Sequence, residues 1–321
     1  MQKFKKVSDN IQKLTIDNPK TNNENLVWIN IFDAGKKELE YLRKKYNFEL
    51  QHLQASLGKS IAQRPTISHG NGYFFMILHF PIFQNGNIVA GEIEFFIADG
   101  YLVTLHNNNI EILNEFFNLC KKDGASLLAY EFESSAILLY ELLEKLMLSC
   151  YAILDKNSIT ISQAENLIFS QDQKTAVAQI LSLRRNIINF RKIMQNHKNI
   201  IKKLTQVEGK LMSAEKVIKY YNEIIEHSKR IWDLIESQRD MIDVLNSTNE
   251  SLLNYKISDI MKTLTIFSVI VFPLTLMAAI FGMNFPIMPF IANPHGFWII
   301  ISIMVCGSLG MLLYFEKKKW L

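Results

Sequence analysis

The sequence is poor in cysteine and carries little net charge. Its 321 residues include three cysteines, Cys120, Cys150 and Cys306, which are too few and too scattered for a disulfide framework. The formal charge is +4 with acidic and basic residues mixed, whereas a nucleic-acid-binding protein concentrates Lys and Arg on one face. We therefore expect a protein of a reducing compartment that has no nucleic-acid partner.

Charge is absent from one long part of the chain. Asp, Glu, Lys and Arg are missing from Thr263 to Phe315, a window of 53 residues, although the chain has 35 Lys and Arg and 31 Asp and Glu. Only a much larger domain could bury such a window, whereas two bilayer spans of about 20 residues each and a turn fit it. The basic stretch Met1–Lys6 is followed by no apolar run, so we expect no cleaved signal and a cytoplasmic N-terminal part.

Nucleotide-binding and catalytic motifs are also missing. The sequence has no Gly-x-x-x-x-Gly-Lys loop and no His-Glu-x-x-His, and Gly70-Asn71-Gly72 lies between extended runs and is interpreted as a turn. We therefore predict neither an enzyme nor an ATP site.

Turn signals and β-rich runs alternate in the first hundred residues. Asp99-Gly100 stands between two such runs and predicts a hairpin in which both turn residues have positive φ. After Ile110, apolar residues recur every three or four positions, which predicts long helices between 127 and 204. We expect residues 1–204 to form an α+β domain with an antiparallel sheet and a helical second half. The expected strands are 27–31, 73–80, 92–98 and 101–105, and the first expected helix is 36–46.

A very long stalk helix is predicted next, over 205–261 and onward into the first span. No Gly or Pro occurs from Lys210 to Phe272, so a helix of roughly 70 residues, about 100 Å long, can form. Its heptad seam consists of Val217, Tyr221, Ile224, Ser228, Ile231, Ile235, Gln238, Ile242, Leu245, Asn249 and Leu252. We expect copies of the chain to cover this seam. Its polar members either fix the register or indicate a core wide enough for water.

Two transmembrane helices are predicted at 262–281 and 297–315, joined by an outer loop at 282–296. The tail at 316–321 holds three lysines and a tryptophan, which places both termini in the cytoplasm by the positive-inside rule. We expect a multi-pass protein of the cytoplasmic membrane, in contact with lipid. Pro273 interrupts the first span, and the hydroxyls of Thr265 and Ser268 are expected to help satisfy the freed carbonyl.

One face of the first span carries hydroxyl groups between apolar side chains. We call this face the stripe, and it consists of Met261, Leu264, Thr265, Ser268, Phe272, Thr275 and Ala279. In a symmetric oligomer the stripe would line a central path. The alternative is that each hydroxyl bonds back to its own helix.

The segment Gly282-Met283-Asn284, at the outer end of the first of two terminal spans and before Met288-Pro289, resembles the mark of the CorA magnesium channels. Other segments resemble the same family, namely Trp28-Ile29-Asn30, Gln63-Arg64-Pro65, Glu223 to His227, Pro273-Leu274-Thr275 and Lys317 to Leu321. The resemblance implies a funnel-shaped homopentamer in the inner membrane, whose first spans line the pore. It implies that the cargo is magnesium, with cobalt and nickel as further cargo, and that cytoplasmic magnesium closes the pore.

The resemblance also implies residue roles. A ring of Asn284 amides would hold the hydrated ion through its waters, because Mg²⁺ gives up water reluctantly. Gly282 would let the chain turn out of the span, and Met283 would pack to hold the ring. Thr275 would add a hydroxyl ring, and Leu264 with Met261 would form constrictions that gate by dewetting. Phe272 and Ser258 depart from the familiar Met and Asn.

The expected regulatory and capture sites depart from the family pattern. Glu223 matches an acidic position that binds cytoplasmic magnesium between subunits, or else it belongs to a solvated helix face. The usual acidic partners are replaced by Ser56 and Leu57, and the outer loop carries no carboxylate and one histidine, His295. Two other functions remain open. One is transport of zinc or another transition metal, and the other is a non-conducting, membrane-tethered coiled-coil scaffold.

Overall fold

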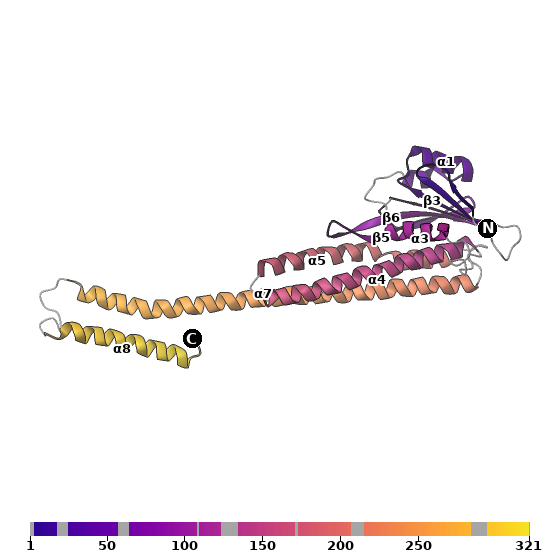
Figure 1. Ribbon diagram of the computed structural model, residues 1–321. Coiled ribbons are helices and arrows are strands. Elements are labelled where there is room, and N and C mark those ends of the chain that lie inside the picture. Colours follow the sequence, from indigo (N-terminus) through magenta and orange to yellow (C-terminus); the bar gives the residue numbers. More distant parts are fainter. Residues whose placement is uncertain are drawn as a thin grey trace. The chain divides into compact units, whose positions relative to one another are not determined.

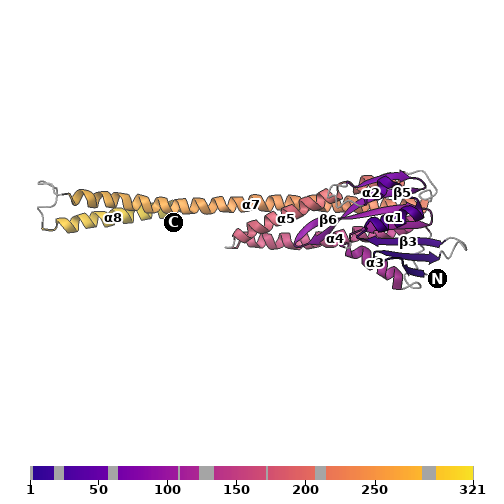
Figure 2. The ribbon, with the colours of Figure 1, turned by 90° about the horizontal axis from the view of Figure 1, so that it is seen from above.

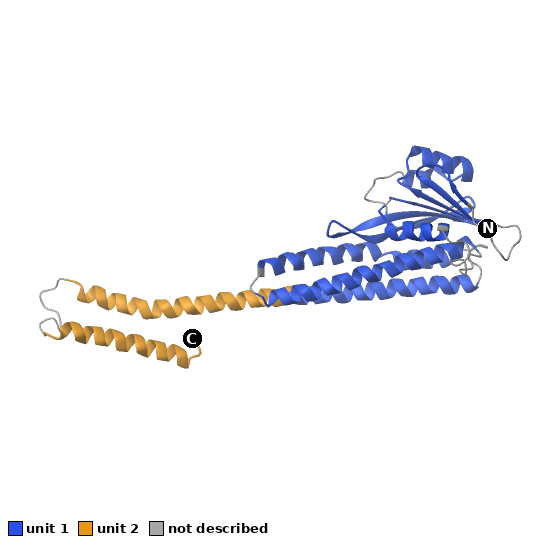
Figure 3. Cartoon of the chain, viewed as in Figure 1, with its two compact units in different colours: residues 1–245 blue, residues 246–321 orange. Residues whose placement is uncertain are grey.

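The structure is a computed structural model that describes residues 3–17, 25–56, 64–107, 109–122, 134–170, 173–206, 215–283 and 294–320. The chain divides into two compact units, Met1–Leu245 and Asn246–Leu321, which Figure 3 colours separately. The boundary falls inside one helix, α7 (Glu215–Phe281), whose 67 residues agree with the predicted length.

The first unit contains a seven-stranded sheet in the order β1-β2-β3-β7-β6-β5-β4. The strands are β1 (Lys3–Lys6), β2 (Ile11–Asp17), β3 (Asn25–Phe32), β4 (Thr66–Gly70), β5 (Tyr73–Gln84), β6 (Asn87–Ala98) and β7 (Tyr101–His106). Five neighbouring pairs are antiparallel, but β3 and β7 pair in parallel, so the prediction of an antiparallel sheet is wrong at its centre. Turn residues predict hairpins between strands that are neighbours in the sequence. Strands β3 and β7 lie more than 60 residues apart, so no turn residues indicate that they pair.

The hairpin turns follow the predicted positions. Ala98 pairs with Tyr101, which confirms the hairpin at Asp99-Gly100, and Gly70 pairs with Tyr73 around the predicted turn. At the first of these turns only Gly100 has positive φ, +77°, so the expectation of two positive angles was wrong there. It holds instead at Asn85 (+51°) and Gly86 (+79°), the combination that matches strand twist in a two-residue hairpin.

Helices cover both faces of the sheet (Figure 1). On one face, α1 (Lys36–Tyr46) and α2 (Leu50–Ala55) contribute Leu39, Leu42 and Leu53 to a buried core with β-strand side chains. The other face is covered by α3 (Glu111–Lys122), α4 (Ser135–Ile168), α5 (Gln173–Met194) and α6 (His197–Thr205). The first unit is therefore a layered α/β domain, in which α1 alone among these helices was predicted with its bounds.

Trp28, singled out by the resemblance, has a structural role at the sheet centre. Its ring is fully buried and lies edge-on to Phe117 of α3, with centroids 4.8 Å apart. Its Nε1–H donates to Thr104 Oγ1 at 3.1 Å, and the Thr104 hydroxyl donates to Asn30 Oδ1 at 2.8 Å. These bonds join β3 to β7, so the buried polar groups support the parallel pairing that the sequence did not reveal.

The seam of α7 is covered by the chain's own helices up to Leu245. Figures 1 and 2 both show α4 and α5 beside this part of α7, and the seam side chains from Val217 to Leu245 are buried. Gln238 Nε2 donates to Leu154 O at 2.7 Å and to Ser158 Oγ at 2.8 Å, which fixes the register against α4. The expectation that copies of the chain cover the seam was therefore wrong here, because α4 offers a complementary face within the same chain.

Tyr221→Phe tests this helix pairing. The Tyr221 hydroxyl is buried and donates to Ala136 O of α4 at 2.9 Å. We expect the variant to lower the free energy of unfolding by about 1 kcal/mol, the usual net contribution of one hydrogen bond. The urea midpoint of the full chain in detergent measures the loss. Tyr255→Phe is the control, because Tyr255 is 67% exposed and its variant should leave the midpoint unchanged.

Because of His197, we expect the folded protein to lose stability in acid. Burial lowers the pKa of this histidine to about 4, and its ring packs edge-on against Phe80. The unfolded chain protonates this histidine near pH 6.5, whereas the folded chain does so only near pH 4. The contribution of the neutral ring to the free energy of unfolding is therefore fully present above pH 6.5 and is lost as the pH falls toward 4. The expected loss in the free energy of unfolding is on the order of 3 kcal/mol.

Melting temperatures between pH 7 and pH 4.5 should fall less steeply for His197→Leu than for wild type. A variant of the exposed His69, His69→Leu, should keep the wild-type slope, and equal slopes for all three proteins would contradict the assignment.

Candidate ion pathway

The second unit contains the two apolar helices that are long enough to cross a membrane by length and composition. They are the end of α7 and α8 (Gly296–Lys317), which lie side by side in Figures 1 and 2. Each turns one face inward. In the apolar part of α7 the buried side chain is Ile266, 8% exposed, and on α8 it is Phe315, 7% exposed. Four of the partly buried residues of α8 recur at three- and four-residue spacing, namely Ile300, Met304, Ser308 and Met311, and Ile299 lies next to the first.

The stripe lies on the other side of α7 from its inward face. At 100° per residue, Leu264, Ser268 and Phe272 point away from the direction of Ile266. Phe272 is 71% exposed, and Met261 and Leu264 are each 56% exposed. Thr265, Thr275 and Ala279 are also exposed, and Ser268 is partly exposed. A single chain thus brings all predicted lining residues to one face, which is uncovered like most of the apolar part of α7, where Phe267 is 64% and Leu276 61% exposed.

Each hydroxyl of the stripe bonds back to its own helix. Thr265 Oγ1 donates to Met261 O at 2.7 Å, Ser268 Oγ to Leu264 O at 2.8 Å and Thr275 Oγ1 to Val271 O at 2.9 Å. These bonds confirm the return bonding named from the sequence, and they are compatible with a lining role. Because the hydroxyl proton is used inside the helix, the oxygen keeps lone pairs that can accept a hydrogen bond from a water molecule. The stripe therefore presents acceptors at three levels.

The prediction for Pro273 was wrong in one respect. Pro273 removes the donor that would reach the Val269 carbonyl, and Thr265 and Ser268 were expected to help. Their hydroxyls donate instead to Met261 O and Leu264 O, because a serine or threonine in a helix most easily reaches the carbonyl four residues before it. The helix nevertheless continues through Pro273 to Phe281.

Gly282 closes the last turn of α7. Its backbone N–H donates to Ala278 O at 2.9 Å, and a Cβ added at this position would lie 3.0 Å from the same oxygen. The glycine thus permits a close approach of backbone to backbone. Met283, which was expected to pack, is 52% exposed in the single chain. Asn284 lies outside the described residues, as do Leu57 and Gln63 of the cytoplasmic part.

Glu223, the predicted sensing residue, is exposed on α7 and accepts a hydrogen bond at 3.1 Å from the Tyr140 hydroxyl of α4. Burial raises the pKa of Tyr140, and the nearby Glu144 and Glu223 carboxylates raise it further, so this hydroxyl stays a donor. Ser56 uses its hydroxyl locally, on His52 O at 3.2 Å. Within the described ranges, no three His, Cys, Asp or Glu side chains gather to hold a metal ion.

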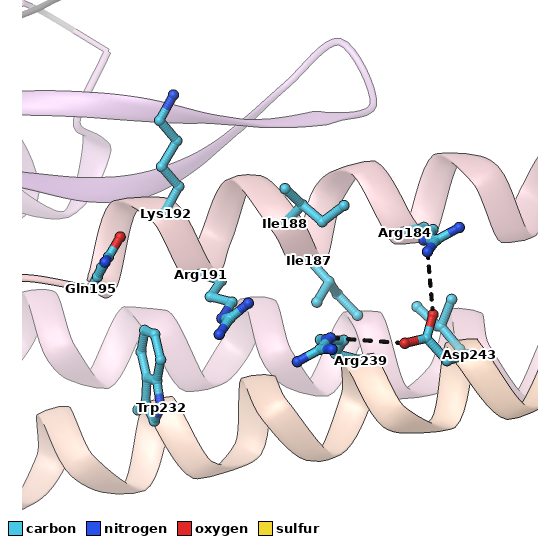
Figure 4. Close-up of a pocket in the computed structure, with 10 residues that line it drawn as sticks. Arg184, Ile187, Ile188, Arg191, Lys192, Gln195, Trp232, Arg239 and Asp243 are labelled. Atoms are coloured by element: carbon cyan, nitrogen blue, oxygen red, sulfur yellow. Dashed lines mark ion pairs between the residues drawn. The ribbon is translucent and has the colours of Figure 1, made fainter.

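Charged residues between α5 and α7 form a network that the sequence reasoning missed (Figure 4). Arg191 pairs with Glu236 at 2.5 Å and Arg239 pairs with Glu236 at 3.0 Å. Asp243 lies 3.7 Å from Arg184 and 3.8 Å from Arg239. The spacing of Glu236, Arg239 and Asp243 on one helix was visible in the sequence, but their pairing with α5 depends on the tertiary structure.

Comparisons with known proteins agree with this architecture. A model of the family described as "CorA-like Mg2+ transporter protein" matches residues 23–318. The cobalt/magnesium transport protein CorA of Methanocaldococcus jannaschii is 23% identical over 297 residues, 92% of each chain. The protein of the same name from Thermotoga maritima is 31% identical over 184 residues, which are 57% of this chain and 52% of that one.

Solved structures share the fold. The complete structure of the CorA magnesium transporter from Methanocaldococcus jannaschii superposes with a TM-score of 0.82 at 20% identity, covering 98% of this chain and all of that one. The structure of the full-length CmaX protein gives 0.72 at 16% identity, covering 93% and 90%. These likenesses concern the fold, while the family match extends over both units. The resemblance of the terminal motif is therefore confirmed, and the chain belongs to the CorA-like Mg2+ transporter family.

Proposed function

We propose that this chain carries Mg²⁺ across the cytoplasmic membrane, through a central path lined by the stripe of α7 in a funnel-shaped homopentamer. The observation that carries the proposal is an exposed face of α7. This face bears hydroxyl acceptors and lies on the side of the helix away from Ile266. The hydroxyl oxygens of this face keep lone pairs that water in a central path can fill and hydrocarbon cannot. Copies of the same face around an axis satisfy it with water and ions.

The chemistry of the stripe suits a hydrated ion. Mg²⁺ holds six waters in octahedral geometry, and these waters are donors. Hydroxyl oxygens of Thr265, Ser268 and Thr275, with protons already used by the helix, can accept from them. Neutral acceptors hold the ion without trapping it, which conduction requires. The membrane potential supplies about 4.6 kcal/mol per 100 mV for each ion that enters.

The remaining assignments belong to the same proposal. The segments are a stalk at 205–261, spans at 262–281 and 297–315, an outer loop at 282–296 and a cytoplasmic tail at 316–321. Asn284 forms the outer ring that selects the hydrated ion, next to Gly282 and Met283. Both termini are cytoplasmic, as the lysines of the tail indicate. The outward side of α8 meets lipid.

Regulation and ion choice complete the proposal. Glu223, although it shares a hydrogen bond with Tyr140, keeps an exposed carboxylate that can bind cytoplasmic Mg²⁺ and favour the closed state. Cobalt is a second cargo, as the names of two relatives state for those proteins, and nickel a third. No step of transport requires ATP or covalent chemistry.

Influx of Mg²⁺ into liposomes that contain the full-length protein tests the proposal. We expect uptake that rises with an inside-negative potential and vanishes in liposomes without protein. Uptake of Zn²⁺ but not Mg²⁺ would favour a transition-metal transporter. No uptake of any divalent cation, by an oligomer of intact size, would favour the non-conducting scaffold.

A further inference from the structure

Two grooves flank α7 in the described part of the first unit. The first groove lies between α5 and α7 and has a volume of about 630 Å³ (Figure 4). Four cationic side chains line it, Arg184, Arg191, Lys192 and Arg239, together with Trp232 and a single carboxylate, Asp243. The guanidinium of Arg191 lies 5.3 Å from the centre of the Trp232 ring. We call this the basic groove.

The second groove has a volume of about 610 Å³ and lies between α4 and α7. Four carboxylates line it, from Glu165, Asp233, Glu236 and Asp240, and its described lining includes no Lys or Arg. We call this the acidic groove. The two grooves are thus nearly equal in volume and opposite in charge.

The grooves lie at the same level of α7 on different faces of the helix, and they adjoin at Glu236, which lines the acidic groove and pairs with two arginines of the basic one. Relative to the buried seam residues Ile235 and Ile242, a rotation of 100° per residue places Arg239 roughly 50° to one side, whereas Asp233 and Asp240 lie roughly 150° or more away, on the exposed outward face. The α7 residues of the basic groove fall between Trp232 and Asp243, and those of the acidic groove fall between Asp233 and Leu245. A rotation about an axis roughly along α7 can therefore bring one groove of a copy against the other groove of the next.

Charge remains in both grooves after the pairs inside the chain are formed. Glu236 already pairs with Arg191 and Arg239, so it belongs to the basic side as much as to the acidic one. The carboxylates of Glu236 and Asp243 neutralise two of the four cations of the basic groove, which therefore keeps an excess of positive charge. The acidic groove keeps the carboxylates of Glu165, Asp233 and Asp240. These excesses attract each other across an interface and resist the docking of two like grooves.

Apolar side chains accompany the charges on both sides. In the acidic groove, Met241 is 48% exposed and Val244 is 64% exposed. In the basic groove, Ile188 is 52% exposed. Apolar side chains inside a charged rim are typical of a protein interface. A small anion would neutralise the basic groove only, and Met241 and Val244 of the acidic groove would stay exposed to water. A protein surface can cover both grooves, so it is the better occupant.

We propose that the basic groove of one copy packs against the acidic groove of the next copy in the oligomer. This contact joins two different surfaces of the same chain, and such a contact builds a closed ring when the rotation between neighbouring copies closes, as the proposed homopentamer requires. The inference rests on the self-association that the proposed function requires, and it adds the surfaces that make it. Guanidinium-carboxylate contacts, and no bound ion, hold this level of the assembly.

Charge reversal with rescue tests the interface in the full-length protein in detergent. Arg184→Glu with Lys192→Glu should raise the concentration at which half of the oligomer dissociates by about tenfold or more, a change of one decade in affinity. Glu165→Lys with Asp240→Lys should do the same. All four substitutions in one chain exchange the signs of the grooves, so the oligomer should recover. Analytical ultracentrifugation over a dilution series measures each protein.

A matched control and an ionic test complete the design. Lys174→Glu with Arg185→Glu changes the charge of α5 equally at exposed positions outside the groove and should leave dissociation unchanged. Raising NaCl should weaken the wild-type oligomer, while a chelator of divalent cations should not. Circular dichroism verifies that each variant is folded. Unchanged dissociation in both double variants, or no recovery in the fourfold variant, would overturn the interface. Because the readout is assembly, an intact interface without Mg²⁺ flux would count only against the proposed transport.

Discussion

Asn284→Ala should abolish most of the Mg²⁺ influx while leaving the oligomer intact. The proposed ring of amides offers carbonyl oxygens to the waters of the ion, and alanine offers none. A loss of only about 1.4 kcal/mol of stabilisation at this point already slows passage tenfold, and a ring loses several acceptors at once. We expect a reduction on the order of tenfold or more. Uptake into liposomes under an inside-negative potential, at equal protein content, gives the comparison.

Asn293→Ala is the matched control, because it removes an asparagine from the same outer loop but not from the motif. It should retain wild-type uptake. Asn284→Gln, which keeps the amide on a longer side chain, should fall between the two. If Asn284→Ala transported Mg²⁺ as fast as wild type, the role of the ring would be lost, although Mg²⁺ transport by the protein would stand.

Leu264→Asn should increase the leak of Mg²⁺ through the closed protein. Leu264 and Met261 are each 56% exposed on the stripe, at the end of the span that the proposal places on the cytoplasmic side, where a ring of apolar side chains would exclude water from a narrow path. A polar ring at this level stays hydrated, so the barrier for the ion falls. An increase on the order of tenfold corresponds to a barrier lowered by about 1.4 kcal/mol.

The leak is measured as Mg²⁺ efflux from liposomes that have high Mg²⁺ both inside and outside. Under this condition the wild-type pore is expected to be closed. Leu264→Met is the control, because it keeps an apolar side chain of similar volume and should leave the leak low. A leak that is equally low in Leu264→Asn would remove the apolar gate from this position. Thermal unfolding of both variants verifies that the helix is undisturbed.

Much of the candidate site could be predicted because its signals are local. The stripe from Met261 to Ala279 follows from helical spacing alone, and the structure brings those residues to one exposed face. The return bonds of Thr265, Ser268 and Thr275 could be stated only as one of two alternatives, since rotamers depend on the packed helix. The ring at Asn284 stays a prediction, because the structure does not describe that residue.

The basic and acidic grooves could not be predicted from spacing. Arg184 and Arg191 lie on α5, while Arg239 and Asp243 lie on α7 some fifty residues later, and only the packing of the helices brings them within 4 Å. The same applies to Tyr140 and Glu223, whose hydrogen bond joins α4 to α7. Such pairs depend on which helix faces which, and amphipathic patterns do not specify the partner.

The sequence by itself determined the parts of this protein that depend on neighbouring residues. The absence of charge from Thr263 to Phe315 defined two apolar helices, and the absence of Gly and Pro from Lys210 to Phe272 allowed one helix to run from Glu215 to Phe281. The hairpin turn at Asp99-Gly100 followed from turn chemistry. These features arise from hydrophobic transfer and local backbone preference, which act within a few residues.

Only the tertiary structure decided which of these elements meet. It paired β3 with β7 in parallel and gave the seam of α7 its partner in α4, where the sequence had suggested another copy of the chain. It also left the stripe uncovered and placed grooves of opposite charge on different faces of α7. The physical reason is that a helix or strand must bury its apolar face, yet many faces are equally apolar. The choice among them depends on shape and on buried hydrogen bonds such as those of Trp28 and Gln238, which form only when distant segments come together.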